Sequence, residues 1–171
     1  MILGMTTYTY TLIHVVISLI GIGSGVVVLW GMSRSKRLNG ITAIFLASTV
    51  LTSVSGFGFP NQHLTPGLKL GIISLVLLAI AIPARYLFHL AGGWRLTYVI
   101  TAAMALYLNV FVLVVQLFEK SPTLRALAPT QSEPPFVATQ LVVLVAFIGL
   151  TVLAGKKFRL EAPRYEQRRA A

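Results

Sequence analysis

Five long apolar runs alternate along this chain with short polar segments and with segments rich in glycine or proline. As an α-helix, at about 1.5 Å per residue, each run is long enough to cross a hydrocarbon layer about 30 Å thick. We therefore predict five transmembrane helices, at about residues 12–32, 39–57, 68–88, 95–118 and 136–154. The predicted fold class is an all-α integral membrane bundle, with residues 1–155 forming a single transmembrane domain.

The fourth run has two different faces when it is read at 3.6 residues per turn. One face, at steps of three and four residues, is small or polar and consists of Tyr98, Ala102, Ala105, Asn109, Val112, Gln116 and Glu119. Large aliphatic residues, among them Leu106 and Leu113, occupy the other face. Because an amide exposed to hydrocarbon is costly, the polar face should contact other helices. We expect the bundle to be organised around this helix.

Small residues predict where helices approach one another closely. Gly21 and Gly25 form a GxxxG pair in the first run, and Gly71 shares a face of the third run with Ser74. These three glycines are the predicted packing positions. Arg85 lies within one turn of the end of the third run, so we expect its side chain to extend to the lipid headgroups.

Composition agrees with a membrane protein. Hydrophobic residues make up 56% of the chain and charged residues 11%, and the mean hydropathy is +0.83. The chain has no cysteine, so a disulfide framework and a thiolate metal site are excluded. Its net charge of +10 arises from short basic blocks between apolar runs, a pattern typical of membrane topology and not of nucleic-acid binding.

The distribution of these basic blocks predicts the orientation. Of the 14 Lys and Arg residues, only Lys69, Lys120 and Arg125 fall on one side of the predicted bundle. The positive-inside rule then places the N-terminus outside and the C-terminus in the cytosol, as an odd number of spans requires. We expect an uncleaved first helix in a bacterial inner membrane, and a basic cytosolic tail, residues 156–171, that contacts anionic lipid headgroups.

The ionisable residues argue against several classes of membrane protein. The chain has no Asp, and none of its four Glu residues lies deep in a predicted span. Ion-coupled carriers generally require a carboxylate within the membrane, so this class is disfavoured. The HExxH and GxSxG patterns are also missing from the sequence, and a Ser-His-Asp set cannot form without Asp. We therefore expect a protein that is not an enzyme.

In this orientation, polar residues gather in the outer half of the bundle. The predicted ligand pocket consists of His14, Ser18, Asn109, Gln116, Glu119 and Gln140. An apolar groove capped by a few polar groups is the usual composition of a ligand site. Two occupants remain open: a quinone or lipid headgroup at His14, Gln116 and Gln140, or a haem b ligated by His14 and His63. His89 is expected at the opposite surface, too far away to share one iron with His14.

The histidine early in the first run and the basic turn SRSKRLNG before the second run resemble the layout of small uncharacterised bacterial inner-membrane proteins. In outline the chain is also similar to compact b-type cytochromes of the membrane. Those proteins pair ligand histidines across a bundle, and this sequence does not show such a pair. The resemblance implies an architecture only. We expect an accessory or ligand-binding protein that associates with a second copy or another membrane protein, with a haem- or quinone-linked redox protein as the alternative.

Overall fold

The computed structural model describes residue 2 and residues 4–60 and 65–158. Within this part the fold is all-helical, with the elements α1 (Thr7–Ser33), α2 (Asn39–Gly56), α3 (Pro66–Tyr86), α4 (Trp94–Lys120), α5 (Pro122–Leu127) and α6 (Pro134–Lys157). Five of these helices are long and apolar enough to span a membrane, which confirms the predicted number. The sixth, α5, is a short helix in the link before the last span.

The helices α1 and α3 begin before the predicted spans, and each has a polar cap. Thr6 caps α1 by accepting a hydrogen bond from the backbone N–H of Thr9, and Thr65 caps α3 in the same way from Leu68. Each cap satisfies a backbone donor that the first turn leaves without an intrahelical partner. Apolar patterning detects the apolar part of a helix, whereas these polar caps lie outside it.

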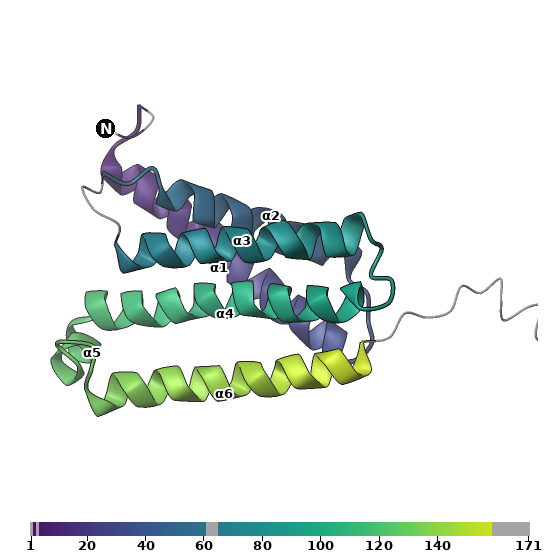
Figure 1. Cartoon of the computed structure of the whole chain (residues 1–171). Coiled ribbons are helices and arrows are strands. Elements are labelled where there is room, and N and C mark those ends of the chain that lie inside the picture. Colours follow the sequence, from purple (N-terminus) through teal and green to yellow (C-terminus); the bar gives the residue numbers. More distant parts are fainter. Residues whose placement is uncertain (1, 3, 61–64, 159–171) are drawn as a thin grey trace, which may run out of the picture.

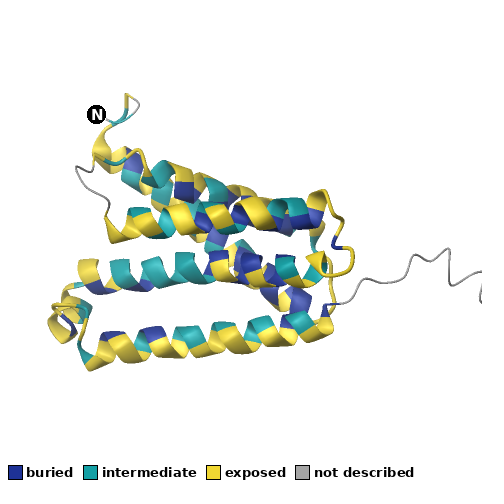
Figure 2. Ribbon diagram, in the orientation of Figure 1, coloured by how far each residue is buried: buried dark blue, intermediate teal, exposed yellow. Residues whose placement is uncertain are grey.

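The central element is α4, which packs against each of the other five helices. The described chain runs back and forth, so that α1 begins at one end of the bundle and α6 ends at the other (Figure 1). We call the end that holds the α1–α2 turn, the α3–α4 turn and the end of α6 the basic end. The last span, α6, packs mainly on α1 and α4 and is exposed along most of its length (Figure 2).

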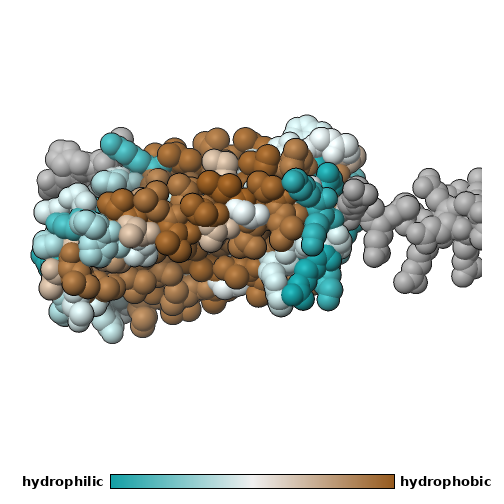
Figure 3. Space-filling model, turned by 90° about the horizontal axis from the view of Figure 1, so that it is seen from below, coloured by the Kyte–Doolittle hydropathy of each residue, from teal (hydrophilic) through white to brown (hydrophobic). Residues whose placement is uncertain are grey.

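The outer surface carries an apolar belt between two more polar ends (Figure 3). On α6, for example, Val142, Val145 and Ile148 are 55–69% exposed. Such a continuous apolar surface on several helices is unfavourable in water and suits lipid chains. The five apolar helices therefore indicate a membrane protein.

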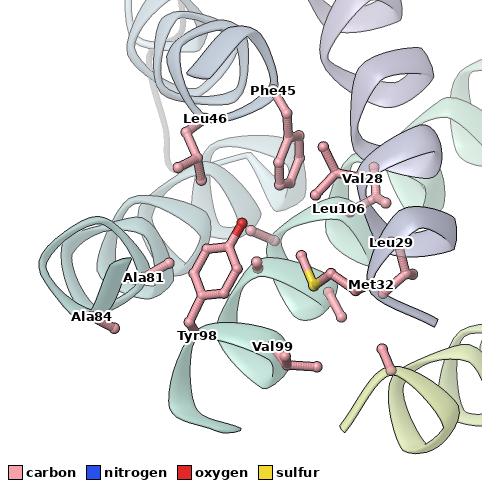
Figure 4. Close-up of a cluster of buried hydrophobic side chains, with 14 of the residues drawn as sticks. Val28, Leu29, Met32, Phe45, Leu46, Ala81, Ala84, Tyr98, Val99 and Leu106 are labelled. Atoms are coloured by element: carbon pink, nitrogen blue, oxygen red, sulfur yellow. The ribbon is translucent and has the colours of Figure 1, made fainter. Parts of the chain in front are cut away.

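The tightest packing lies in the half of the bundle towards the basic end. Here Phe45 and Leu46 of α2 meet Val28 of α1 and Tyr98 and Leu106 of α4, all almost fully buried. Figure 4 shows the ring of Tyr98 pointing from α4 towards Phe45 and Leu46. This closed half leaves the other half of α1–α4 as the place where a cavity can form.

Gly21 and Gly25 lie at the contact between α1 and its neighbours, as the GxxxG pattern suggests. A Cβ atom on Gly21 would lie 3.1 Å from Oγ of Ser48 on α2. A Cβ atom on Gly25 would lie 2.6 Å from Cδ1 of Leu106 and 2.8 Å from the ring of Phe45. The absence of a side chain at these two positions lets α1 approach α2 and α4.

Hydrogen bonds at the basic end attach the last helix to the rest of the bundle. Arg95 of α4 donates to the carbonyl oxygens of Gly155, at 3.0 Å, and of Phe158. Ser35 in the α1–α2 turn donates to the carbonyl of Lys157. These donors satisfy carbonyls that the last turn of α6 leaves without intrahelical partners, and the Arg95 cation also interacts favourably with the helix dipole.

Arg85 differs from its expected position among the lipid headgroups. Its side chain is only 8% exposed, and Nη2 donates to Oδ1 of Asn39 on α2 at 2.8 Å. The guanidinium group also lies 5.2 Å from the centroid of the Tyr98 ring. The neighbouring amide and aromatic ring offer the cation a hydrogen bond and a cation–π contact, so the side chain turns inward and links α3 to α2 and α4.

The link between α4 and α6 packs as a second, smaller apolar cluster around Val114, Phe118, Ala128 and Phe136. Glu133 precedes α6, and its carboxylate accepts hydrogen bonds from the backbone N–H and hydroxyl of Thr130 and from the backbone N–H of Ser132. Partial desolvation raises the pKa of Glu133, but these hydrogen bonds outweigh it, so the pKa lies below its usual value. The carboxylate form therefore orders this turn.

Candidate functional site

A cavity of about 680 Å³ lies between α1, α2, α3 and α4, in the half of the bundle away from the basic end. Its walls are mostly aliphatic, with Leu19 and Ile22 from α1 and Val112 and Leu113 from α4. This volume lies within the range of about 300–1,000 Å³ that is typical of small-molecule sites. An apolar cavity with a few polar groups is a binding site by composition, and its polar groups decide what can bind.

Several positions that line the cavity have no side chain. Gly56 ends α2, and Gly67 and Gly71 occupy the first turns of α3. A Cβ atom built on Gly56 or Gly67 would meet no described atom within 4 Å, and one on Gly71 would meet only the carbonyl oxygen of Ser53, at 3.7 Å. Larger residues at these positions would extend into the space that the cavity occupies.

His14 forms part of the wall in the second turn of α1. Its Nδ1 atom lies 2.7 Å from Oγ of Ser55, and its ring contacts the edge of Phe59 at 5.3 Å between centroids. The hydroxyl of Tyr10 donates to the carbonyl of the same Ser55, at 2.7 Å. A hydrogen bond at one ring nitrogen orients the imidazole and leaves Nε2 as the nitrogen through which His14 can contact a ligand.

Three polar side chains from three helices lie deeper in the cavity: Thr52 of α2, Ser74 of α3 and Asn109 of α4. We call them the inner polar group. Thr52 and Ser74 are only 8% and 3% exposed. Within the described residues, Oγ1 of Thr52, Oγ of Ser74 and Nδ2 of Asn109 are buried without a hydrogen-bond partner. Buried polar atoms are normally paired. Of the five described side-chain atoms that are buried without a partner, these three belong to residues that line the cavity, whereas the hydroxyl of Tyr98 and Oε1 of Gln140 do not.

The mouth of the cavity has a different character. Gln116 lines it one turn from the end of α4. Lys120, the last residue of α4, is the only Lys, Arg, Asp or Glu among the described residues that line the cavity. Along the α4 axis, Lys120 lies roughly 16 Å from Asn109 at about 1.5 Å per residue. The cavity therefore combines a charged mouth with an uncharged inner end.

Of the predicted pocket residues, His14, Ser18, Asn109 and Gln116 line this cavity, although the hydroxyl of Ser18 donates to the carbonyl of His14. Glu119 and Gln140 lie outside its lining. Glu119 is exposed and accepts a hydrogen bond from Gln116, at 3.4 Å.

Gln140 is buried between α6 and α4. It donates to the carbonyl of Phe111, at 3.2 Å.

Gly71, predicted as a packing position, lines the cavity, and a Cβ atom on it would lie 3.7 Å from the carbonyl oxygen of Ser53 on α2. His63, the second haem ligand in the alternative hypothesis, lies outside the described residues.

Sequence reasoning missed the importance of Thr52 and Ser74. Hydroxyls in membrane helices usually bond to their own backbone, as Ser48 and Thr49 of α2 do. Thr52 of the same helix instead lines the cavity. For Ser74, the sequence feature that could have indicated a site is its position one turn after Gly71 on the same helix face. The glycine has no side chain, so space can remain beside the hydroxyl of Ser74.

The described residues contain no group of three or more His, Asp or Glu side chains arranged to hold a metal ion. No protein family, curated protein or solved structure matches the chain. The interpretation of the site therefore depends on its own geometry and chemistry.

Proposed function

We propose that this protein is an integral membrane protein that binds a small amphiphilic molecule in the cavity between α1, α2, α3 and α4. The observation that carries the proposal is a cavity of about 680 Å³ with an apolar wall and three unpaired buried polar atoms. An apolar wall favours a ligand that already resides in a membrane, because hydrocarbon surface is buried there. The polar atoms favour one that also carries a hydrogen-bonding group. Binding, with no reaction at the site, is the proposed activity.

The proposed orientation places the basic end in the cytosol and the cavity mouth at the outer surface of a bacterial inner membrane. At the basic end the described residues include Arg34, Lys36, Arg37, Lys156 and Lys157 and no acidic residue. The described acidic residues, Glu119 and Glu133, are at the opposite end. This asymmetry follows the positive-inside rule.

A pair of reporter fusions tests the orientation. Alkaline phosphatase fused before α1 should be active and a fluorescent protein fused after the basic tail should fold, because these reporters work outside and inside the cytosol respectively. If both fusions report from the same compartment, the proposed orientation is wrong.

Filling the cavity tests the proposed function. In Gly71→Leu the new side chain extends into the cavity, and Gly149→Leu is the matched control because a Cβ atom on this exposed residue of α6 meets no described atom within 4 Å. The three proteins are purified in mild detergent, and their organic extracts are compared by mass spectrometry. We expect an amphiphile enriched with the native protein and with Gly149→Leu and depleted with Gly71→Leu. Identical extracts from all three proteins would contradict the proposal.

A haem is the competing occupant, because His14 lies on the cavity wall with one ring nitrogen already oriented. A protein with bound haem b would show a Soret absorption band, and that band would weaken in His14→Ala. A colourless preparation that still carries the amphiphile would exclude the haem and support the proposed binding function.

A further inference from the structure

The cavity has two polar regions with different chemistry, and the inner one restricts the ligand. Lys120 and Gln116 lie at the mouth, whereas the inner polar group has no ionisable side chain. Ser74 lies more than two helical turns from the start of α3, and Asn109 about three turns from the end of α4. A charged ligand group at this depth would lose its hydration without an opposite charge to replace it. The inner end is therefore built for an uncharged group.

The identities of the unpaired atoms restrict the ligand further. Nδ2 of Asn109 is an amide nitrogen, which can only donate a hydrogen bond. The hydroxyls of Thr52 and Ser74 can also donate, and both residues line the same cavity. The amide nitrogen of Asn109 therefore requires an acceptor, and a carbonyl oxygen, with two lone pairs, can accept from it and from one of the two hydroxyls as well. The hydroxyls of Ser18 and Ser55 differ in this respect, because both already donate to backbone carbonyls.

From these observations we infer that the ligand carries an uncharged carbonyl group, which the inner polar group holds with its oxygen between Thr52, Ser74 and Asn109. Its apolar part lies along the aliphatic wall towards the mouth. This inference rests on the proposed binding function and specifies the class of ligand. Two kinds of membrane molecule share this chemistry, namely quinones, with ring carbonyls, and acylglycerols, with ester carbonyls. The experiment below separates these two sources.

The test compares three probes with matched apolar parts and different polar groups. Decylubiquinone has ring carbonyls, monodecanoylglycerol has an ester carbonyl, and 1-phenyldecane has no hydrogen-bond acceptor of this kind. Binding to the full-length protein in detergent is followed by native mass spectrometry, which counts the ligand-bound molecules directly. We expect at least one carbonyl probe to bind at least fivefold more tightly than 1-phenyldecane. The tighter of the two identifies the source as a quinone or an acylglycerol.

The decisive variants remove one donor each. Ser74→Ala and Thr52→Val should each weaken binding of the preferred carbonyl probe about 2- to 10-fold, the range for loss of one hydrogen bond, and leave 1-phenyldecane binding unchanged. Ser24→Ala is the matched control because its hydroxyl donates to carbonyls of its own helix and it does not line the cavity. It should leave the binding of all three probes unchanged.

The outcomes separate this inference from the proposed function. If Gly71→Leu lowers binding of all three probes but Ser74→Ala and Thr52→Val behave like Ser24→Ala, the cavity binds amphiphiles and the carbonyl inference is wrong. The same conclusion follows if 1-phenyldecane binds as tightly as the carbonyl probes. If Gly71→Leu leaves the binding of every probe unchanged, the cavity is not the binding site and the proposed function itself is wrong.

Discussion

Replacing Gly25 by alanine should destabilise the bundle, whereas the same replacement at Gly23, two residues earlier in α1, should not. A Cβ atom on Gly25 would lie 2.6 Å from Cδ1 of Leu106 and 2.8 Å from two ring carbons of Phe45. On Gly23 it would meet no described atom within 4 Å. The methyl group at position 25 can be accommodated only if α1 moves away from α2 and α4 or if Phe45 and Leu106 leave their packed positions.

The expected magnitude follows from these contacts. Overpacking of a well-packed core costs about 1–3 kcal/mol. A change from glycine to alanine within a helix also contributes up to about 1 kcal/mol of favourable helix propensity, in each of the two variants. Because this gain cancels when the variants are compared, Gly25→Ala should be less stable than Gly23→Ala by about 1–3 kcal/mol.

Reversible unfolding in mixed micelles, with increasing mole fractions of sodium dodecyl sulfate, measures this difference in the free energy of unfolding. Trp30, in the last turn of α1, and Trp94, the first residue of α4, supply the fluorescence signal. If the two variants unfold within about 0.5 kcal/mol of each other, the close approach at Gly25 does not support the closed half of the bundle, and our account of the packing that confines the cavity is wrong.

Three further predictions concern polar groups outside the cavity. Asn39→Ala removes the acceptor for Arg85 and should cost about 1.5–3 kcal/mol in the same unfolding assay, because the lost hydrogen bond involves a buried cation; a change below 0.5 kcal/mol would contradict this role. Because the pKa of Glu133 lies below its usual value, the stability that it contributes to the turn before α6 is complete above the ordinary carboxyl pKa and is lost as the pH falls through the lowered pKa. The protection factors of the amides in this turn, which divide the intrinsic exchange rate at each pH by the measured rate, should fall over that acidic range in the native protein, and Glu133→Gln should abolish this fall; an unchanged profile in the variant would assign it to another group. Gln140→Leu should leave binding of the preferred carbonyl probe unchanged, because Gln140 contacts the carbonyl of Phe111 outside the cavity lining; weaker binding would place Gln140 in the ligand site.

Much of the fold follows from local properties of the chain. The number of spans, their approximate limits and the central position of the helix from Trp94 to Lys120 could be predicted, and the structure agrees. Length and hydropathy are properties of a single segment. Comparing them with the thickness of the hydrocarbon layer identifies a span without information about any other segment. The stripe through Tyr98 and Asn109 marked one protein-facing side of α4 for the same reason. The prediction that the opposite face contacts lipid was wrong in part, because Leu106 is buried in the core and Leu113 lines the cavity.

The candidate site could be predicted only in part. The polar stripes placed His14, Asn109 and Gln116 on faces that point towards other helices, and these residues line the cavity. Depth alone also grouped Gln140 with them, but α6 packs on the side of α4 away from the cavity lining. Depth in the membrane is encoded in sequence position, whereas the direction of a residue around the bundle axis depends on which helices are neighbours.

By itself, then, the sequence determined a membrane bundle of five spans and the distribution of charge between its two ends, because both depend on local composition. Only the tertiary structure decided where the bundle is closed and where it is open. Gly25 allows tight contact between α1, α2 and α4 towards the basic end, whereas Gly67 and Gly71 leave space in the other half. The same kind of residue thus has opposite effects, since the consequence of a missing side chain depends on whether a neighbouring helix lies close enough to fill its place.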